Sequence, residues 1–383
     1  MRRRSFIRGG IVAAAAPSLL WDGLLLPAPA RGDGVDQPGL PRPFRDGPIR
    51  LTQNENPLGM PTGVLRAVTE AATDGHRYPR LGQQLVRALA ARNGLPPATV
   101  MLGNGSTEIL RVAVHAAAAR GPVRLVLPDP TYEAVGRFAV PWATDVVRIP
   151  LAPDHGHDLD AMRAAAGAAH GPVFIFVCNP NNPTGGTSPC DDVESWIRDA
   201  PDHHFFLVDE AYFEFADAPG YRTLAPLAVT RPNVLVSRTF SKIYGMAGLR
   251  LGYGIGEAAT IRRMQAFTSG LNINHLAHAA GLAALDDDDY IRRSLASNRA
   301  ALRIATSTLD ELDLEWLPTH TNFVMHRVAG DLETYIGHMR DAGILVGRPF
   351  PPLLSWNRVS LGRPEEMGVW ADTLRSFRHR GWA

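Results

Sequence analysis

The chain has 383 residues, of which 45% are hydrophobic and 20% are charged, and its formal net charge is +1. This composition is that of a large globular enzyme of two subdomains, and the near-neutral charge gives no indication of a nucleic-acid partner. Two cysteines in so long a chain do not form a disulfide framework, and no cysteine–histidine cluster has the spacing of a zinc site.

The N-terminal segment has the pattern of an export signal. Arg3 and Arg4 precede an apolar pair, a modest apolar stretch follows, and residues 28–30 (Ala-Pro-Ala) form a small-x-small cleavage site. The stretch is too short and too interrupted by proline to span a bilayer stably. We expect a twin-arginine signal peptide over residues 1–30, a linker over 31–48, and a periplasmic or otherwise exported protein. A disordered basic tail and an uncleaved anchor are the alternatives.

Short apolar runs alternate with helical stretches from about residue 100 onward. Buried strands are predicted at residues 123–127, 173–177, 205–208 and 234–236, with a weaker, glycine-containing candidate at 250–255. Helices are predicted between them, including residues 107–119 and 158–169. This alternation indicates an α/β sheet.

The C-terminal part begins with a run of aspartates, residues 286–289, which opens a long helix running towards Leu312. Acidic residues in a first helical turn interact favourably with the helix dipole, so the run needs no metal ion to explain it. Short strand-like segments and another helix follow Glu315, which indicates a smaller C-terminal domain.

A glycine-rich segment, residues 103–108, leads directly into a predicted helix. Free backbone N–H groups at a helix N-terminus favour a bound phosphate, and a plain turn is the equal alternative. A dinucleotide fingerprint is rejected, because the preceding strand is doubtful and Glu108 stands where a third glycine is needed.

Asp209 stands at the end of a buried strand, where a carboxylate is costly unless it is paired. A protonated pyridine nitrogen would be such a partner, and an ionised aspartate would keep that ring able to accept electrons. Tyr212 could then reach a phenolic oxygen of the ring. The alternative for Asp209 is a helix N-cap.

Two further loops follow predicted strands. The asparagine- and proline-rich residues 179–185 predict a turn with exposed amide donors, and a simple turn is the alternative. Tyr132 follows another strand and could stack on an aromatic cofactor, although a core or rim position would also suit a tyrosine.

The most informative run surrounds Lys242, which Thr239 and Ser241 precede and Arg250 follows. A lysine amine can form a Schiff base with an aldehyde cofactor, and hydroxyls and a guanidinium suit a phosphate on it. A basic loop with a glycine-rich turn is the alternative when this run is taken alone.

Together these motifs resemble the fold-type I pyridoxal-phosphate aminotransferases of class I/II, and within them the histidinol-phosphate aminotransferase branch. The motifs occur in the family's order at residues 54–57, 78–79, 103–108, 179–185, 209–212, 237–252 and 357–362. The resemblance implies a mostly parallel central sheet with flanking helices and a smaller α+β C-terminal domain. It places an N-terminal arm that joins the small domain at residues 49–75, the large cofactor-binding domain at 76–285, and the small domain at 286–383.

The resemblance also implies roles for individual residues. Lys242 would hold pyridoxal 5'-phosphate as an internal aldimine and move the substrate proton, Asp209 would pair with the ring nitrogen, and Tyr132 would stack on the ring. Tyr212 and Asn182 would bind the phenolic oxygen. The phosphate would be held by the backbone at Gly105 and Ser106 together with Thr239, Ser241 and Arg250.

Further implied contacts involve the substrate and a second subunit. Tyr78 would reach the cofactor phosphate of a neighbouring subunit, which implies a homodimer with shared active sites. Arg358 would clamp the substrate α-carboxylate by a bidentate pair, and Asn182 and Asn56 would also contact the substrate. The partners implied are therefore a small amino acid and a 2-oxo acid.

The chain departs from the family at three points. Leu58 replaces the usual tyrosine after the Asn-Glu-Asn-Pro motif, residues 347–356 differ from the usual sequence and leave the role of Arg348 open, and an export signal is unexpected for histidine biosynthesis. We therefore expect transfer of an amino group from another amino acid to a 2-oxo acid. A decarboxylase, racemase or cyclase on the same fold is the alternative, and a non-catalytic cofactor-binding protein is a more distant one.

Overall fold

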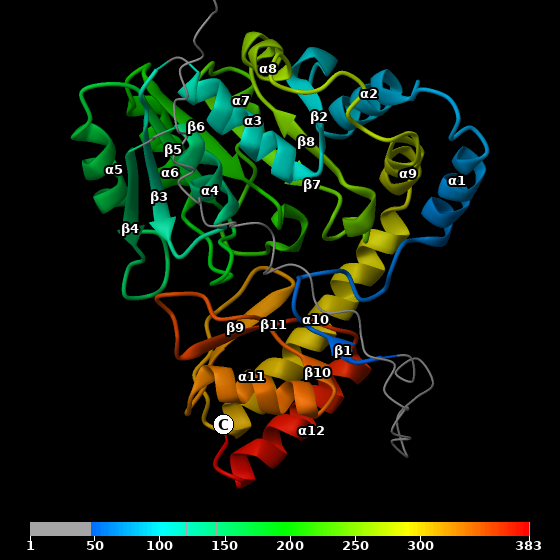
Figure 1. The fold of residues 1–383 in the computed structure, drawn as a ribbon, viewed down its shortest axis with the longest axis vertical. Coiled ribbons are helices and arrows are strands. Elements are labelled where there is room, and N and C mark those ends of the chain that lie inside the picture. The colour runs from blue at the N-terminus through cyan, green and yellow to red at the C-terminus, as the bar shows by residue number, and fades with distance from the viewer. Residues whose placement is uncertain (1–46, 120, 143–144, 383) are drawn as a thin grey trace, which may run out of the picture. The chain divides into compact units, whose positions relative to one another are not determined.

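The computed structural model describes residues 47–119, 121–142 and 145–382 (Figure 1). The predicted signal peptide and most of the predicted linker lie outside these residues. From Pro48 onward the chain forms one unit, which contains all of the elements named in this section. In the described part of the chain, no helix is both long enough and apolar enough to cross a membrane.

The centre of the fold is a seven-stranded sheet with the strand order β2-β8-β7-β6-β5-β3-β4. Its strands are β2 (Val100–Asn104), β3 (Arg124–Asp129), β4 (Asp145–Pro150), β5 (Val173–Cys178), β6 (His204–Asp209), β7 (Val234–Thr239) and β8 (Leu251–Ile255). The five strands from β7 to β4 run parallel, and β8 runs antiparallel to both of its neighbours. The predicted mostly parallel α/β fold is therefore confirmed.

Helices cover both faces of this sheet, which explains why its central strands are apolar throughout. Alternate residues of β5 enter two separate hydrophobic clusters, Ile175 one and Phe176 the other. One face is covered by α2 (Gly82–Arg92), α5 (Leu159–Gly167), α6 (Cys190–Asp199), α7 (Ala225–Ala228) and α9 (His275–Leu285). The other face, which we call the α3 face, is covered by α3 (Ser106–Ala118), α4 (Ala134–Ala139) and α8 (Ala258–Gln265).

The C-terminal part adds two short sheets and three helices. β9 (Phe323–Arg327) pairs antiparallel with β11 (Trp356–Ser360), and β1 (Ile49–Arg50) pairs parallel with β10 (Ile344–Leu345). The helices are α10 (Asp288–Glu311), α11 (Leu332–Asp341) and α12 (Pro364–His379). Short 3-10 helices lie at η2 (Pro97–Thr99), η3 (Val140–Trp142), η4 (Phe213–Phe215) and η5 (Ala247–Leu249).

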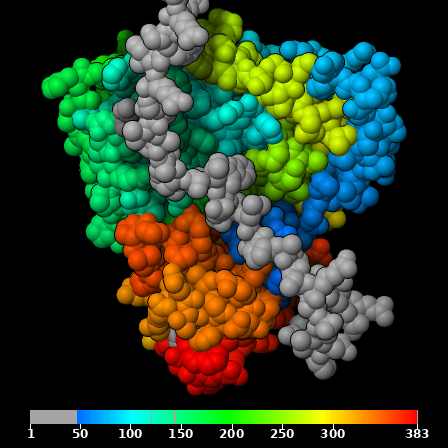
Figure 2. All heavy atoms as spheres, in the orientation of Figure 1, coloured from blue at the N-terminus to red at the C-terminus, as the bar shows by residue number. Residues whose placement is uncertain are grey.

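The segment that precedes the large sheet contacts both parts of the fold. Its first strand, β1, pairs with β10 of the C-terminal part, and Figure 2 shows this blue segment beside the orange C-terminal residues. The following helix α1 (Thr62–Ala72) packs against α9 beside the large sheet. Residues 51–61 therefore run between the two parts, where their polar groups can reach both.

The long helix predicted from the aspartate run is confirmed, with its cap at Asp287. The Asp287 side chain accepts a hydrogen bond from the Tyr290 N–H at 2.9 Å, and Asp288 and Asp289 occupy the first turn. These acidic groups satisfy free N–H groups and face the positive end of the helix dipole. The doubtful strand before residue 105 proves to be real, since β2 pairs with β8 over five residues.

Candidate functional site

The site lies at the edge of the large sheet where the parallel strands end, the usual ligand position in open α/β sheets. Asp209 is the last residue of β6, and Thr239 is the last residue of β7. Asn182 lies in the loop after β5, Tyr132 follows β3, and Gly105 follows β2. The topology thus brings together polar residues that are more than 130 positions apart in the sequence.

Asp209 is buried on the α3 face with one carboxylate oxygen unsatisfied. The residue is 3% exposed, and its Oδ1 has no hydrogen-bond partner among the residues that the structure describes. Burial raises the pKa of Asp209 to about 7, and the charge of Glu210 adds to this, whereas the Ala211 N–H and Lys242 oppose it. A buried, unsatisfied carboxylate oxygen calls for a cationic donor, and a protonated pyridine nitrogen fits it.

Lys242 lies in the loop after β7, and its amine is only partly reachable by solvent. Its Nζ donates a hydrogen bond to the Gln53 carbonyl at 3.1 Å and lies 5.7 Å from the centroid of the Tyr212 ring. Burial lowers the pKa of Lys242 to about 8, and the charge of Arg358 lowers it further. A lowered pKa leaves a larger fraction of neutral amine, which is the form that attacks an aldehyde.

A phosphate-sized anion fits the start of α3. Gly105 caps this helix with a φ of 73°, and no side chain of the described residues caps the helix N–H groups. The Gly105 N–H donates to the Arg250 carbonyl at 2.9 Å, and a Cβ at Gly105 would collide with the Arg250 guanidinium. Free N–H groups, the helix dipole and an adjacent arginine together favour an anion here.

The hydroxyl residues before Lys242 are tied to this same helix start. Thr239 pairs with Gly252 across β7 and β8, and a Cβ at Gly252 would collide with the backbone of Ser106. Thr239 Oγ1 accepts a hydrogen bond from the Ser241 N–H at 3.1 Å. The five predicted phosphate ligands are therefore brought into one region by β-pairing and by two glycines.

Arg358 extends from β11 towards the sheet. Its Nη1 donates to Asn182 Oδ1 at 2.7 Å, its Nη2 donates to the Thr52 carbonyl at 2.6 Å, and its Nε has no partner among the described residues. Burial lowers the pKa of Arg358 to about 10, so the guanidinium remains cationic at neutral pH. A buried cation whose charge reaches Lys242 is suited to an anionic group of a substrate.

The structure also reveals a role for Asn54, which the sequence motif contained without an assigned function. Asn54 has a φ of 55°, its Nδ2 donates to the Tyr212 hydroxyl at 2.9 Å, and its Oδ1 accepts from the Ser360 hydroxyl at 2.7 Å. Asn54 therefore links the N-terminal segment to β11 and to the site tyrosine. Burial raises the pKa of Tyr212, so its phenol stays protonated at neutral pH.

Three other predicted residues have different surroundings. The Asn56 amide donates to the Ile243 carbonyl at 2.9 Å and to Ser294 Oγ at 3.0 Å, so its contact with a substrate stays a prediction. Tyr132 packs against the core of the α3 face. Tyr78 is 81% exposed, so it makes little contact with the rest of the described chain.

Arg348, whose role the sequence left open, pairs with the large sheet's α4 region. Its Nη2 lies 2.6 Å from Glu133 Oε1, and its guanidinium lies 4.3 Å from the ring of Phe350. Glu133 directly follows Tyr132 in the chain, so Arg348 is held close to the site by an ion pair.

Comparison with known proteins is consistent with this geometry. Residues 46–374 match the family model "Aminotransferase class I and II". The chain is 38% identical to histidinol-phosphate aminotransferase 2 of Ralstonia nicotianae, covering 86% of this chain and 88% of the relative. It is 35% identical to histidinol-phosphate aminotransferase 1 of Cupriavidus pinatubonensis, covering 90% of each.

A solved structure extends the likeness to the cofactor. The histidinol-phosphate aminotransferase of Sinorhizobium meliloti, crystallised with pyridoxal-5'-phosphate, is 27% identical with a TM-score of 0.81, covering 88% of this chain and 93% of that one. The unsatisfied Asp209 oxygen, the Lys242 amine and the anion cradle at Gly105 fit the three functional parts of this cofactor. The chain therefore belongs to the class I and II aminotransferases, which transfer amino groups with pyridoxal phosphate as their cofactor.

Proposed function

We propose that this protein is an exported homodimeric aminotransferase that moves the amino group of a free amino acid to a 2-oxo acid. The observation that carries the proposal is the buried Asp209 oxygen without a partner among the described residues, in a site that also holds Lys242 and Arg358. These three residues supply, in turn, a partner for a cationic ring, a nucleophilic amine and a cation for the substrate carboxylate.

The cofactor, when bound, serves as the electron sink for the bond broken at the substrate Cα. Lys242 would hold the cofactor covalently and, once released, would carry the Cα proton on its amine. Asp209 would keep the ring nitrogen protonated, and Tyr132 would stack on the ring. Tyr212 and Asn182 would bind the phenolic oxygen. The lowered pKa of Lys242, about 8, suits an amine that must both accept and return a proton near neutral pH.

The cofactor phosphate is assigned to the cradle at the start of α3. The backbone at Gly105 and Ser106 would hold it together with Thr239, Ser241 and Arg250, with the Ser106 N–H as donor because the Gly105 N–H is held by the Arg250 carbonyl. Tyr78 of the neighbouring subunit adds a contact in the proposed dimer. Support for that contact comes from the exposure of this tyrosine and from other exposed apolar side chains, Leu65, Phe267 and Leu271.

Substrate binding is assigned to Arg358. A substrate carboxylate can take the place of the Thr52 carbonyl and accept from two nitrogens of the guanidinium at once. Asn182 Oδ1, at 2.7 Å from Nη1, orients the guanidinium for this bidentate contact. With its carboxylate fixed on Arg358, the substrate would point its amine towards Lys242. This arrangement would orient the Cα bond that is to be broken.

The relatives' names make histidinol phosphate the first compound to test against free amino acids. Two features of this chain favour a free amino acid. Leu58 lacks the hydroxyl of the family's usual tyrosine, and Arg348 is already paired with Glu133 at 2.6 Å. The site residues alone are shared by decarboxylases, racemases and cyclases on this fold, so the reaction class needs its own measurement.

A half-reaction screen tests the proposal. The purified holoenzyme is mixed with single amino acids or with histidinol phosphate, and loss of the cofactor's visible absorption is followed. We expect one or a few amino acids to bleach the band with formation of a 2-oxo acid, and a 2-oxo acid to restore it. Release of carbon dioxide or an inverted Cα centre would contradict transamination.

The Lys242→Ala variant is the control for this screen. It removes the amine that holds the cofactor and carries the proton, so all turnover between an amino donor and a 2-oxo acid should be lost. Persistent turnover in this variant would overturn the assignment of Lys242.

A further inference from the structure

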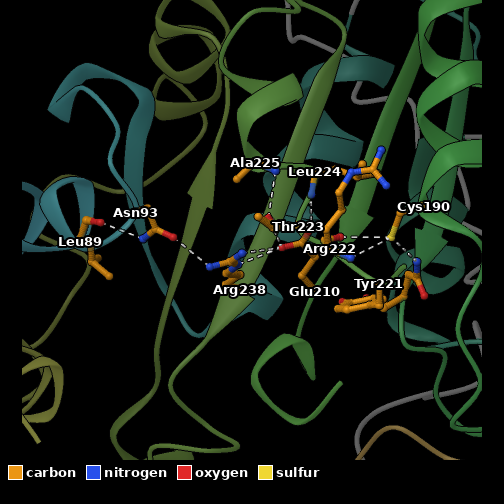
Figure 3. Close-up of polar contacts among 11 residues, drawn as sticks. Leu89, Asn93, Cys190, Glu210, Tyr221, Arg222, Thr223, Leu224, Ala225 and Arg238 are labelled. Atoms are coloured by element: carbon orange, nitrogen blue, oxygen red, sulfur yellow. Dashed lines mark hydrogen bonds and ion pairs between the residues drawn. The ribbon is translucent and has the colours of Figure 1, made fainter. Parts of the chain in front are cut away.

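Glu210 and Arg238 form a buried ion pair (Figure 3), and they directly follow Asp209 and precede Thr239, respectively, in the chain. Their side chains are 2% and 5% exposed, and Arg238 Nη2 and Nε lie 2.8 and 2.9 Å from Glu210 Oε2. None of the roles in the proposed function uses either residue. A buried ion pair costs desolvation that its attraction barely repays, so stability alone gives little reason for it.

Each member of the pair is adjacent in the chain to a residue of the cofactor face. Asp209 pairs with Ser237 in the sheet register, and the Glu210 N–H donates to the Ser237 carbonyl at 2.8 Å. Successive residues of a strand point to opposite faces of a sheet. Asp209 and Thr239 therefore face the cofactor, whereas Glu210 and Arg238 face α2 and α7.

Uncharged groups on both sides of the pair hydrogen-bond to it. Arg238 Nη1 donates to Asn93 Oδ1 at 2.9 Å, just after the end of α2, and its guanidinium lies 3.9 Å from the Phe213 ring. Glu210 Oε2 accepts from the Thr223 hydroxyl at 2.8 Å, and its Oε1 accepts from the Leu224 N–H at 2.8 Å. Both carboxylate oxygens therefore have partners, and these contacts tie the ends of β6 and β7 to each other and to the start of α7.

The same network reaches the loop that carries Asn182. Tyr221, two residues before Thr223, donates a hydrogen bond from its hydroxyl to the Asn179 carbonyl at 2.9 Å. Cys190 Sγ donates to the Arg222 carbonyl at 3.1 Å. Figure 3 shows these contacts beside those of the pair, and residues 221–223 join the two sets through the chain.

We propose that Glu210 and Arg238 are positioning residues that lock the ends of β6 and β7 and so set the orientation of Asp209 towards the cofactor ring nitrogen. This inference rests on the proposed role of Asp209. The Glu210 N–H is bonded to the carbonyl of Ser237, the residue that pairs with Asp209, so the pair acts on Asp209 through the backbone. The charge of Glu210 also raises the pKa of Asp209.

Two variants separate positioning from stability. Arg238→Lys keeps the charge but loses the fork that contacts Glu210 and Asn93 together. The double variant Glu210→Gln with Arg238→Met removes both charges together, so neither member is left as an unpaired buried ion and the variant should fold. Arg375→Lys is the matched control, because Arg375 makes a comparable fork with Glu311 on the surface, with Nη2 at 2.7 Å from Oε2.

Three quantities are measured for each variant: the apo-protein melting temperature, the dissociation constant for pyridoxal phosphate, and the 15N chemical shift of the ring nitrogen in labelled cofactor. For both pair variants we expect cofactor affinity to fall about tenfold, as for other residues that orient a ligand-binding group. The 15N shift should move towards that of an unprotonated pyridine. The Arg375→Lys protein should match the wild type.

A lower melting temperature with wild-type affinity and a wild-type 15N shift would overturn the proposal and leave the pair a purely structural element. If neither pair variant folds, Asn93→Ala removes the hydrogen bond from Arg238 to Asn93 instead. Weaker cofactor binding and a 15N shift towards unprotonated pyridine would support the proposal, and wild-type values of both would overturn it. A wild-type protein that forms no visible cofactor band would instead count against the proposed function, so the two failures are distinguishable.

Discussion

Asp209 and Lys242 are placed where burial works against the charge of each. Burial raises the pKa of Asp209 to about 7 and lowers that of Lys242 to about 8. In the apo-protein both groups therefore titrate near neutral pH, far from their ordinary values of 3.8 and 10.5. A cationic ring nitrogen would restore the charge of Asp209 and so return its pKa to a lower value.

The first prediction concerns the stability of the apo-protein. Between pH 3.8 and about 7 the folded state keeps a proton on Asp209 that the unfolded state releases, so the group's contribution to stability falls as pH rises through this window. The Asp209→Asn apo-protein should therefore be more stable than wild type above pH 7, on the order of a few kcal/mol, with the difference vanishing near pH 4. Urea unfolding at several pH values measures this, and a pH-independent difference would contradict it.

The second prediction concerns the same substitution in the holoenzyme. Asparagine cannot hold the ring nitrogen protonated, so kcat should fall by about a hundredfold or more while the apo-protein stays folded. Steady-state kinetics with saturating cofactor measure the loss. Asp160→Asn, at a 93% exposed side chain on α5, is the control and should leave kcat unchanged.

The sequence predicted which single residues belong to the site, but it did not predict which residues they contact. Lys242, Asp209 and Arg358 each stand in a motif from which the residue's role could be predicted. The Asn54 contact with Tyr212 spans 158 positions and the Arg358 contact with Asn182 spans 176, so only the fold could reveal them. The Glu210–Arg238 pair was missed for the same reason, although both residues stand next to predicted site residues.

At the scale of elements, the start of α3 depends on a glycine for two independent reasons. Gly105 has a φ of 73°, which side-chain-bearing residues adopt only with strain, and its missing Cβ leaves room for the Arg250 guanidinium. A side chain at residue 105 would therefore strain the backbone and push the Arg250 guanidinium away from the cradle.

The third prediction concerns that cradle. Gly105→Ala should destabilise the protein by about 1–3 kcal/mol and weaken pyridoxal-phosphate binding at least tenfold, because Arg250 must move away. Thermal unfolding and cofactor titration measure the two effects. Gly167→Ala, in a helix with no atom within 4 Å of the added Cβ, should keep wild-type cofactor affinity. Equal behaviour of the two variants would exclude the steric argument.

The strands predicted from the sequence were those whose residues are nearly all buried. The apolar runs of β3, β5, β6 and β7 are buried almost throughout, and the predicted strands there are confirmed. β4 was missed because its side chains are partly exposed and mixed in polarity, and β2, which the sequence left doubtful, ends in glycine and asparagine. Both strands are stabilised by pairing with a neighbouring strand, and this pairing cannot be predicted from the local sequence.

At the scale of the whole molecule, the proposed dimer makes a fourth prediction. If Tyr78 serves the partner's site, a heterodimer of a Lys242→Ala subunit and a Tyr78→Ala subunit contains one site with both residues intact. Co-purified heterodimers should then recover close to half the wild-type activity per dimer, although each homodimer is impaired. Recovery no better than the mean of the two homodimers would contradict shared sites.

Export is the fifth prediction. Replacing Arg3 and Arg4 by lysine should retain the protein in the cytoplasm, because the twin-arginine route reads that pair. Cell fractionation followed by assay of cofactor-loaded protein measures this. Unchanged export of the double variant would show that another route is used.

Successive side chains of β6 point to opposite faces of the sheet, and this limits which insertions the strand can accept. Inserting one residue within β6 while keeping its outer register would turn Asp209 towards α7 and Glu210 towards the cofactor. A carboxylate with one extra methylene would then face the ring, and a shorter one would face Arg238. Both the ring partner and its support would be lost together, so only changes that preserve the two-residue period of the strand are compatible with the site.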